Sequence, residues 1–362
     1  MIIMAKIKVG ILGATGMVGQ RFIELLQNHP WFDVTCVAAS PSSAGKTYEQ
    51  AVKGRWKMQS KIPDDIGKLI VKMVEEDIDY ICKEVDFVFS ALDMDKQKIR
   101  EIEESYASRN IPVVSNNSAH RWTEDVPMII PEINPEHINL IDIQRKKRGW
   151  KKGFIAVKPN CSIQSYVPII KALDKFKPKK VVVTTLQAVS GAGRTLESWP
   201  EMAENVIPFV KNEEEKSEKE PLKILGEIKN GKLKLAKTPK ISATCIRVPV
   251  EDGHIASVEI QLGRKVNEKQ FISAVAKYDN PIAKLGLPSA PKEFIKYFSE
   301  EDRPQTRLDR NFEHGMGITF GRLRQDDILG WKFVALSHNT IRGAAGGAIL
   351  LAELLKAKGY LV

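Results

Sequence analysis

The 362-residue chain has few cysteines and lacks a long apolar run, and each shortage excludes a class of protein. Its four cysteines, Cys36, Cys82, Cys161 and Cys245, are widely spaced and none belongs to a CxxC pair. This spacing argues against a zinc site and against a disulfide framework, and it fits a reducing cytosol. No apolar stretch is long enough to span a bilayer. We therefore expect a cytoplasmic protein with no membrane segment and no bound metal.

Targeting and repeat signals are lacking as well. Residues 1–4 are apolar, but they lead directly into a patterned strand without a small-residue cleavage site, so we predict no signal peptide. The chain has no internal repeat and no low-complexity tract. A chain of this length is expected to form two domains with a substantial core.

Basic residues exceed acidic ones, giving a formal net charge of +10 and an isoelectric point near 9.2. Such an excess can indicate nucleic-acid binding. Here Lys and Arg are interleaved with Asp and Glu, and the one dense basic run, residues 145–152, is short and typical of a solvated loop. Because the chain also lacks a basic patch interleaved with aromatic residues, we expect no nucleic-acid partner. A basic surface favours anionic small molecules such as phosphates.

Strand and helix patterns alternate through the first 158 residues. Apolar strands are predicted at residues 7–13, 33–39, 85–90 and 112–115, and helices at residues 17–27 and 96–108. Further strands at 180–186, 256–262 and 330–337 look like parts of a different, mixed sheet, with a charged helix at 212–230 and a buried one at 342–358. The fold class predicted is α/β, with a doubly wound parallel sheet followed by a mixed sheet.

Cys161 lies in Lys-Pro-Asn-Cys-Ser-Ile-Gln, just before a predicted helix that opens at residues 162–166. A thiolate at a helix N-terminus is stabilised by the positive end of the macrodipole and by unpaired backbone N–H groups. We expect this position to lower the pKa of the thiol and to leave amides available for an oxyanion. The alternative is a buried structural cysteine. We predict a nucleophile that attacks a carbonyl.

A glycine-rich turn joins the first strand to the first helix. Residues 10–19 read Gly-Ile-Leu-Gly-Ala-Thr-Gly-Met-Val-Gly, in which Gly13, Gly16 and Gly19 bracket the turn. Glycine lets the backbone approach a pyrophosphate, and the helix N-terminus faces the anion. Because the motif follows a strand and opens a helix, it predicts dinucleotide binding rather than a merely structural turn.

The end of the second strand bears on the choice of cofactor. An NAD site usually has an acid there for the ribose 2′-hydroxyl, but residues 38–46 contain none. Ser40, Ser43 and Lys46 would instead accommodate a 2′-phosphate, so we favour NADP over NAD, with an ordinary polar loop as the alternative. Ser90 and Leu92 end a later strand, where backbone contact with the cofactor is expected.

Three further segments carry side chains suited to acyl chemistry. A thiol nucleophile needs a proton partner, and His254 follows Arg247 by seven residues in a turn-like segment. Residues 187–194 are too rich in glycine for a plain loop and could approach a nicotinamide or an acyl group. Glu213 and Lys216 are three residues apart on a predicted helix, so their side chains lie on the same face of it. A structural histidine and an incidental surface ion pair are the alternatives.

Taken together, the motifs resemble those of the aspartate-β-semialdehyde dehydrogenases, in their archaeal and fungal branch rather than the usual Gram-negative one. The resemblance extends from Lys6 to the C-terminus. It rests on residues 10–19, 115–121, 159–162, 187–193, 247–254 and 337–347. Several separated motifs in the same order are far more specific than any one of them.

The resemblance implies a role for each candidate residue. Cys161 would be the nucleophile, His254 the acid/base catalyst, and Gln187 would orient the acyl group. The substrate contacts implied are Arg247 for the α-carboxylate, Glu213 for the ammonium, and Arg121, Lys216 and Asn116 or Asn160 for the phosphate. The cofactor contacts implied are Thr15, Gly16, Met17, Val18, Ser40, Ser43, Gly191 and Asn339.

The resemblance also implies an architecture and a reaction. Residues 1–158 plus 340–362 would form an N-terminal Rossmann domain, and residues 159–339 a catalytic and dimerisation domain of a dimer or a dimer of dimers. The reaction would be the NADPH-dependent reduction of L-aspartyl 4-phosphate to L-aspartate 4-semialdehyde through a cysteine thioester. It would belong to lysine, threonine and methionine biosynthesis.

Two relatives with the same chemistry are the alternatives. Malonyl-CoA reductase, which some archaea derived from this family, keeps the thiol, the histidine and the fold. Asn160, Glu213 and Arg247 would recognise the amino-acid part of a substrate, so their presence favours aspartyl phosphate. N-acetyl-γ-glutamyl-phosphate reductase usually has a Gly-Cys-Tyr nucleophile motif, which is absent here.

Overall fold

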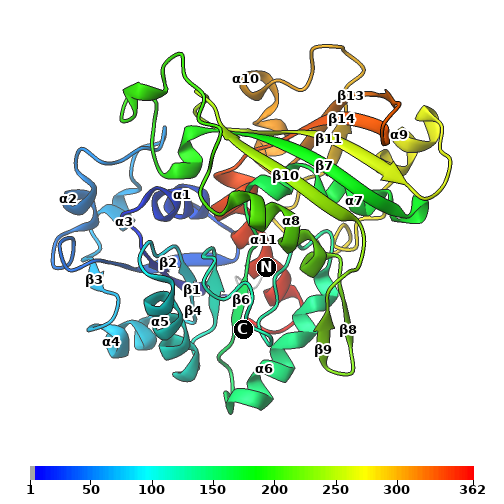
Figure 1. Cartoon of the computed structure of the whole chain (residues 1–362). Coiled ribbons are helices and arrows are strands. Elements are labelled where there is room, and N and C mark those ends of the chain that lie inside the picture. Colours follow the sequence, from blue (N-terminus) through cyan, green and yellow to red (C-terminus); the bar gives the residue numbers. More distant parts are fainter. Residues whose placement is uncertain (1–4) are drawn as a thin grey trace.

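A computed structural model describes residues 5–362, so the apolar start at residues 1–4 and the prediction made on it lie outside the described residues. Two six-stranded sheets organise the chain (Figure 1). The N-terminal sheet, coloured blue to green, lies on one side of the red helix α11 (Gly346–Ala357), and the C-terminal sheet lies on the other. Within residues 5–362, no helix is both long and apolar enough to cross a bilayer.

The first sheet is entirely parallel, in the order β3-β2-β1-β4-β5-β6. Its strands are β1 (Ile7–Leu12), β2 (Phe32–Ala39), β3 (Lys72–Met73), β4 (Phe87–Ser90), β5 (Val113–Ser115) and β6 (Ile155–Val157). Its helices are α1 (Met17–Leu26), α2 (Tyr48–Val52), α3 (Asp64–Gly67), α4 (Ile78–Glu84), α5 (Lys96–Ser108) and α6 (Leu140–Arg148), with a 3₁₀ turn η1 (Pro135–Asn139). This strand order is that of the doubly wound dinucleotide-binding fold, which confirms the predicted class.

The second sheet is mixed, in the order β10-β7-β11-β14-β13-β12. The outer pairs β10–β7 and β12–β13 are parallel and the inner pairs antiparallel. Its strands are β7 (Pro178–Gln187), β10 (Lys240–Arg247), β11 (His254–Leu262), β12 (Ile295–Tyr297), β13 (Ile318–Asp326) and β14 (Gly330–Ser337). The other helices are α7 (Val167–Ala172), α8 (Glu213–Ile224), α9 (Glu268–Ala276) and α10 (Thr306–Asp309). The 3₁₀ turns are η2 (Ser162–Ser165), η3 (Asp174–Phe176), η4 (Val189–Ala192), η5 (Pro200–Met202) and η6 (Phe312–Gly315).

Two helix predictions were too long. The helix expected at residues 212–230 ends at Ile224, and the hairpin of β8 (Glu227–Lys229) and β9 (Lys232–Lys234) follows it. Asn230 and Gly231 have φ angles of 53° and 73°, which a two-residue hairpin turn requires. The helix expected from Arg342 begins as the turn η7 (Ile341–Ala345), which is broken by the non-helical backbone of Ala344 (φ −140°, ψ −108°), before α11.

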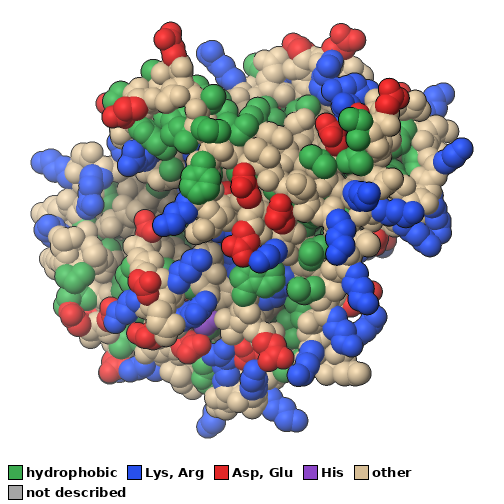
Figure 2. Space-filling model, in the orientation of Figure 1, with side chains coloured by type: hydrophobic (Ala, Val, Ile, Leu, Met, Phe, Trp, Pro, Cys, Tyr) green, Lys and Arg blue, Asp and Glu red, His purple; other side chains and the backbone are tan. Residues whose placement is uncertain are grey.

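Helix α11 is mostly apolar and is buried along nearly its whole length. Its apolar residues between Ala348 and Leu355 pack in one hydrophobic cluster with β1, β2 and α1, and the buried Glu353 among them contacts His29. A helix that is hydrophobic all round is typical of such a buried position. This packing supports the division into residues 1–158 plus 340–362 and residues 159–339, which we keep as a proposal. Figure 2 shows Lys and Arg spread over one face of the molecule together with Asp and Glu.

Candidate active site

Two adjoining cavities lie at the carboxyl ends of the parallel strands. The smaller, about 240 Å³, is lined by residues that include Gly13, Thr15, Gly16, Ser40 and Leu92. The larger, about 550 Å³, is lined by residues that include Met17, Val18, Asn116, Arg121, Asn160, Cys161, Gly191, Glu213, Lys216 and Asn339. Gly16 and Leu92 line both. The structure thus brings together most of the site residues predicted from the sequence.

The glycine turn fits a dinucleotide for steric reasons. Gly13 has a φ of +82°, and a Cβ there would lie 2.4 Å from the carbonyl oxygen of Ala91. A Cβ on Gly19 would lie 2.3 Å from the carbonyl oxygen of Gly13. Helix α1 begins after Gly16 without a side-chain cap, so its first N–H groups are available to a phosphate.

The wall of the smaller cavity differs from the prediction in two respects. Ser43 and Ser90 are buried outside both cavity walls, and Ser90 accepts a hydrogen bond from Asn117. Glu75 and Glu76, which follow β3, line the cavity. Sequence reasoning missed these two acids because it considered only the end of β2, whereas the adjacent parallel strand β3 ends at the same edge.

Cys161, which lines the larger cavity, contacts the buried His254. The Sγ of Cys161 lies 3.5 Å from Nε2 of His254, although the two residues are 93 positions apart. Strand β11 starts at His254, which is therefore the first residue of a strand rather than part of a turn. A Cβ on Gly343 would lie 2.7 Å from Cβ of Cys161, so the turn η7 packs directly against the nucleophile. This is the arrangement of a thiol beside its proton partner.

The expected lowering of the Cys161 pKa is wrong. Burial raises the pKa of this thiol, the charge of Glu213 raises it further, and Lys158, Arg121 and Lys216 act in the opposite direction. The helix expected to open after Cys161 is only the four-residue 3₁₀ turn η2, interrupted before α7 begins. The short turn offers little dipole to offset desolvation. The isolated site therefore favours the protonated thiol.

His254 is neutral and has a defined tautomer. Burial, together with the charge of Arg247, lowers the pKa of His254 to about 3. The backbone N–H of Ala188 points at its Nδ1 with an N–N distance of 3.1 Å. Nδ1 must therefore accept, so the neutral ring carries its proton on Nε2 and directs it at the Sγ of Cys161.

A polar network joins the nucleophile turn to the start of α8. The Nδ2 of Asn160 lies 3.0 Å from both carboxylate oxygens of Glu213. The Nε2 of Gln187 donates to Glu213 at 3.3 Å, and the Nζ of Lys216 lies 2.6 Å from Oε1 of the same carboxylate. The structure thus gathers three predicted residues around the carboxylate of Glu213, beside Cys161.

Arg247 and His254 lie on the same side of Gly191. A Cβ on Gly191 would lie 2.9 Å from Nη1 of Arg247 and 3.1 Å from Nε2 of His254. The Nη1 of Arg247 also donates to the carbonyl oxygen of Ala188 at 2.6 Å. A larger residue at position 191 would force both side chains to shift. Asn339 holds this loop, because its amide accepts from the N–H of Gly253 and donates to Ser190.

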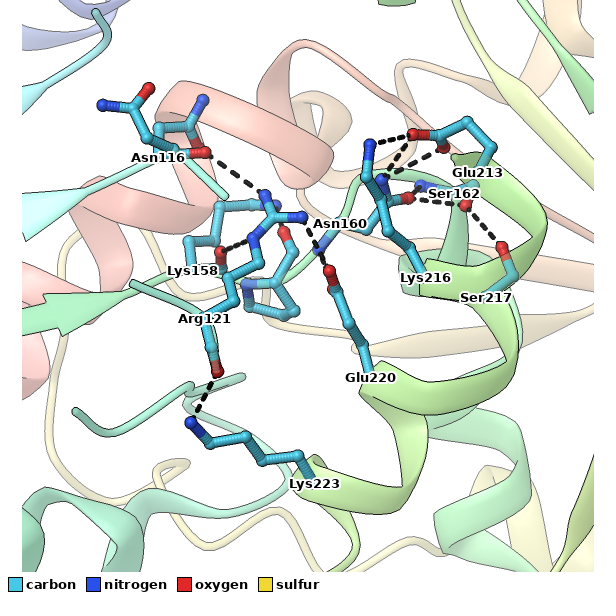
Figure 3. Close-up of polar contacts among 12 residues, drawn as sticks. Asn116, Arg121, Lys158, Asn160, Ser162, Glu213, Lys216, Ser217, Glu220 and Lys223 are labelled. Carbon is cyan, nitrogen blue, oxygen red and sulfur yellow. Dashed lines mark hydrogen bonds and ion pairs between the residues drawn. The ribbon is translucent and has the colours of Figure 1, made fainter. Parts of the chain in front are cut away.

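Arg121 approaches the larger cavity from the first domain. Its guanidinium donates to the carbonyl oxygens of Lys158 and Asn116 and forms an ion pair of 2.9 Å with Glu220 (Figure 3). Asn116 lines the cavity, and its buried Oδ1 has no partner among the described residues. An unpartnered polar atom of this kind fits a ligand at the cavity wall. Glu220 was not singled out from the sequence, although its seven-residue separation from Glu213 on one helix was a signal.

Comparison with known proteins agrees with this geometry. Residues 8–141 match the family model described as semialdehyde dehydrogenase, NAD binding domain, and residues 167–342 match that described as semialdehyde dehydrogenase, dimerisation domain. The chain belongs to the semialdehyde dehydrogenase family. The expectation of a nicotinamide dinucleotide is thereby confirmed, and the match to a dimerisation domain supports a homo-oligomer.

The relatives lie in the predicted branch. The aspartate-semialdehyde dehydrogenase of Archaeoglobus fulgidus is 45% identical over 97% of this chain and 98% of its own length. The crystal structure of the Candida albicans enzyme with NADP has a TM-score of 0.87 and 38% identity, covering 98% of this chain and all of that one. Aspartate semialdehyde dehydrogenase II from Vibrio cholerae, solved with ASA, has a TM-score of 0.74 and 25% identity over 98% of this chain and 99% of that one. The archaeal and fungal resemblance is confirmed.

Proposed function

We propose that this chain reduces L-aspartyl 4-phosphate to L-aspartate 4-semialdehyde and phosphate with NADPH. The observation that carries the proposal is the 3.5 Å contact between Sγ of Cys161 and Nε2 of His254, at a cavity that also exposes Glu213, Lys216 and Arg121. A nucleophile, a carboxylate and two cations suit a substrate with an acyl carbon, an ammonium and a phosphate. One similar structure, the Candida albicans enzyme, was solved with NADP, and another, from Vibrio cholerae, with ASA.

Covalent catalysis begins at Cys161. Its thiolate attacks the acyl carbon, the carbon–oxygen bond to phosphate breaks, and a thioester forms on the sulfur. NADPH, when bound, supplies the hydride that reduces this acyl carbon. The glycine turn around Gly13 and Gly16 and the N-terminus of α1 would hold its pyrophosphate, and Ser40 faces the smaller cavity. Collapse of the resulting thiohemiacetal breaks the carbon–sulfur bond and returns the electron pair to Cys161.

His254 is proposed as the proton partner, and its tautomer defines what it does. Its Nε2–H donates toward the sulfur and toward an oxyanion formed on the adjacent carbon, so it stabilises both as charge develops. Acting as a base on the thiol would require the other tautomer, with a proton on Nδ1 facing the N–H of Ala188. The resemblance implies that His254 acts as both acid and base. The geometry favours the acid role, in which His254 donates a hydrogen bond or a proton from Nε2.

Substrate groups are assigned by charge. Arg247 binds the α-carboxylate, for which the guanidinium fork is suited, and Glu213 binds the ammonium. Lys216 and Arg121, with Asn116 or Asn160, bind the phosphate, and Gln187 orients the acyl group. Because Glu213 raises the pKa of Cys161, an ammonium that neutralises this carboxylate would favour the reactive thiolate when substrate arrives.

The wider setting is proposed with the reaction. We place the protein in the cytoplasm, as a dimer or a dimer of dimers, with the reaction serving lysine, threonine and methionine biosynthesis. Malonyl-CoA reductase is not favoured, because relatives from Archaeoglobus fulgidus and Candida albicans, at 45% and 40% identity, carry the aspartate-semialdehyde name.

The test is a spectrophotometric assay at 340 nm of NADP⁺ reduction with aspartate semialdehyde and phosphate, beside NADPH oxidation with malonyl-CoA. We expect phosphate-dependent turnover of the semialdehyde alone. Cys161→Ala should abolish this turnover and leave the NADP affinity nearly unchanged, whereas Cys82→Ala, in α4, should retain activity. Substantial activity in Cys161→Ala would contradict covalent catalysis, and turnover of malonyl-CoA instead would contradict the substrate assignment.

A further inference from the structure

One face of α8 is buried beside the nucleophile. Glu213, Ser217 and Glu220 lie at positions i, i+4 and i+7, so they share this face, and their exposed fractions are 7%, 0% and 1%. Glu213 lines the larger cavity, whereas Glu220 lies outside its wall. A carboxylate buried to this extent needs partners that replace its lost hydration.

The two oxygens of Glu220 have partners from different parts of the chain. Oε1 lies 2.9 Å from Nη1 of Arg121, and Oε2 accepts the backbone N–H of Asn160 at 2.6 Å (Figure 3). Arg121 lies 99 residues before Glu220, and Asn160 immediately precedes Cys161. One carboxylate therefore connects the arginine assigned to phosphate with the turn that holds the thiol.

The contacts of Arg121 leave it able to bind a ligand. A guanidinium has five N–H groups. Its Nε donates to the carbonyl oxygen of Lys158 at 3.1 Å, Nη2 to that of Asn116 at 3.3 Å, and Nη1 to Glu220. One N–H on each terminal nitrogen remains without a partner among the described residues, and the side chain lines the larger cavity. This is the fork that a phosphate accepts.

Helix α8 is itself anchored, so Glu220 has a defined position. Pro221 has no N–H to donate to the carbonyl oxygen of Ser217 one turn earlier, and the hydroxyl of Tyr166 donates to that oxygen at 2.9 Å. The Nζ of Lys223 lies 2.6 Å from the carbonyl oxygen of Arg121 (Figure 3). The helix thus holds both the nucleophile segment and the loop that carries Arg121.

We infer that Glu220 is a positioning residue of this site, which orients Arg121 and the turn at Asn160 so that the phosphate-binding fork and the thiol face one acyl phosphate. This inference rests on the proposed function, because it requires phosphate as a substrate. Glu220 touches neither the sulfur nor the cavity, and it acts through its two partners.

The test replaces Glu220 with Gln in the full chain. Both partners of Glu220 are donors, and Gln offers one acceptor oxygen and an NH₂ donor, so either Arg121 or Asn160 loses its bond. We expect the KM for phosphate to rise about tenfold, the equivalent of one lost hydrogen bond to a charged group, with the KM for NADP unchanged. Glu215→Gln is the matched control, because Glu215 is an exposed residue of the same helix paired with Lys219.

A double-mutant cycle separates positioning from general structural support. Arg121→Lys removes the guanidinium that Glu220 orients, so adding Glu220→Gln should then raise the KM for phosphate by less than it does in the wild type. If Glu220→Gln loses its cooperative thermal transition, Glu220→Asp takes its place, since it keeps the charge and shortens the side chain by one methylene. We expect Glu220→Asp to raise the KM for phosphate as well, but by a smaller factor.

The outcomes separate the inference from the proposed function. A wild-type protein without phosphate-dependent turnover would overturn both. An active wild type whose KM for phosphate is unchanged in Glu220→Gln and Glu220→Asp would overturn the inference alone. Additive effects of the Arg121 and Glu220 substitutions on that KM would also overturn it.

Discussion

The backbone N–H of Ala188 lies 3.1 Å from Nδ1 of His254, on the side of the imidazole away from Cys161. This hydrogen bond assigns the proton of the neutral ring to Nε2, which faces the sulfur. The loop at η4, which contains Gly191, packs against this ring, because a Cβ on Gly191 would lie 3.1 Å from Nε2 of His254. Small changes in that loop should therefore lower the activity more than they lower the stability of the fold.

Gly191→Ala tests the packing of this loop. The added Cβ would lie 2.9 Å from Nη1 of Arg247 and 3.1 Å from Nε2 of His254, so both side chains must move. We expect kcat/KM for aspartate semialdehyde to fall by about a hundredfold, the effect of a displacement near 1 Å. The melting temperature should change little. Gly67→Ala is the control, because its nearest contact would be an ordinary 3.6 Å, and equal activities of the two variants would contradict the prediction.

The protonation of Cys161 can be read from its alkylation rate. Burial and Glu213 raise the pKa of the Cys161 thiol above its usual value of 9.0, so without substrates the reactive thiolate should still be increasing at pH 9. Glu213→Gln removes one cause of the raised pKa, and its rate profile should shift to lower pH. Iodoacetamide labelling of the Cys161 peptide, followed by mass spectrometry from pH 6 to 10, measures both profiles. A wild-type rate already constant below pH 7 would show that the thiol is ionised in the isolated site.

Lys158 should make stability depend on pH. Burial, together with the charge of Arg121, lowers the pKa of Lys158 from 10.5 to about 7 in the folded chain. Between these values the unfolded chain binds more protons than the folded one, so folding becomes more favourable as the pH rises. Below pH 7 Lys158 is charged in both the folded and the unfolded chain, so the free-energy cost of burying its ammonium is fully present. Replacement by Met removes this cost, so the melting temperature of Lys158→Met relative to wild type should fall as the pH rises from 7 to 10.

The control for that series is Lys61→Met, because Lys61 is exposed. Its melting temperature relative to wild type should stay constant over the same range. If the difference for Lys158→Met is equally constant, the ammonium of Lys158 is not desolvated in the folded chain.

Local patterns predicted most of the fold and much of the site. Gly13 and Gly16 could be recognised because a strand, a glycine turn and a helix are adjacent in sequence, and Glu213 and Lys216 because three-residue spacing places them on one face. Glu220 could not be assigned a role in this way, since its partner Arg121 is 99 residues away and only tertiary folding brings them together. The raised pKa of Cys161 depends on burial, which the local sequence does not determine.

Ser40→Asp should change the choice of cofactor. Ser40 directly follows β2 and lines the smaller cavity, where an acid would bind a ribose 2′-hydroxyl and repel a 2′-phosphate. We expect the KM for NADP to rise at least about tenfold, the scale of a like-charge contact, while the KM for NAD falls. Ser108→Asp adds the same charge at the exposed end of α5 and should leave the preference unchanged. Because Glu75 and Glu76 already line this cavity without belonging to β2, an unchanged ratio in Ser40→Asp would mean that they, rather than the end of β2, set the preference.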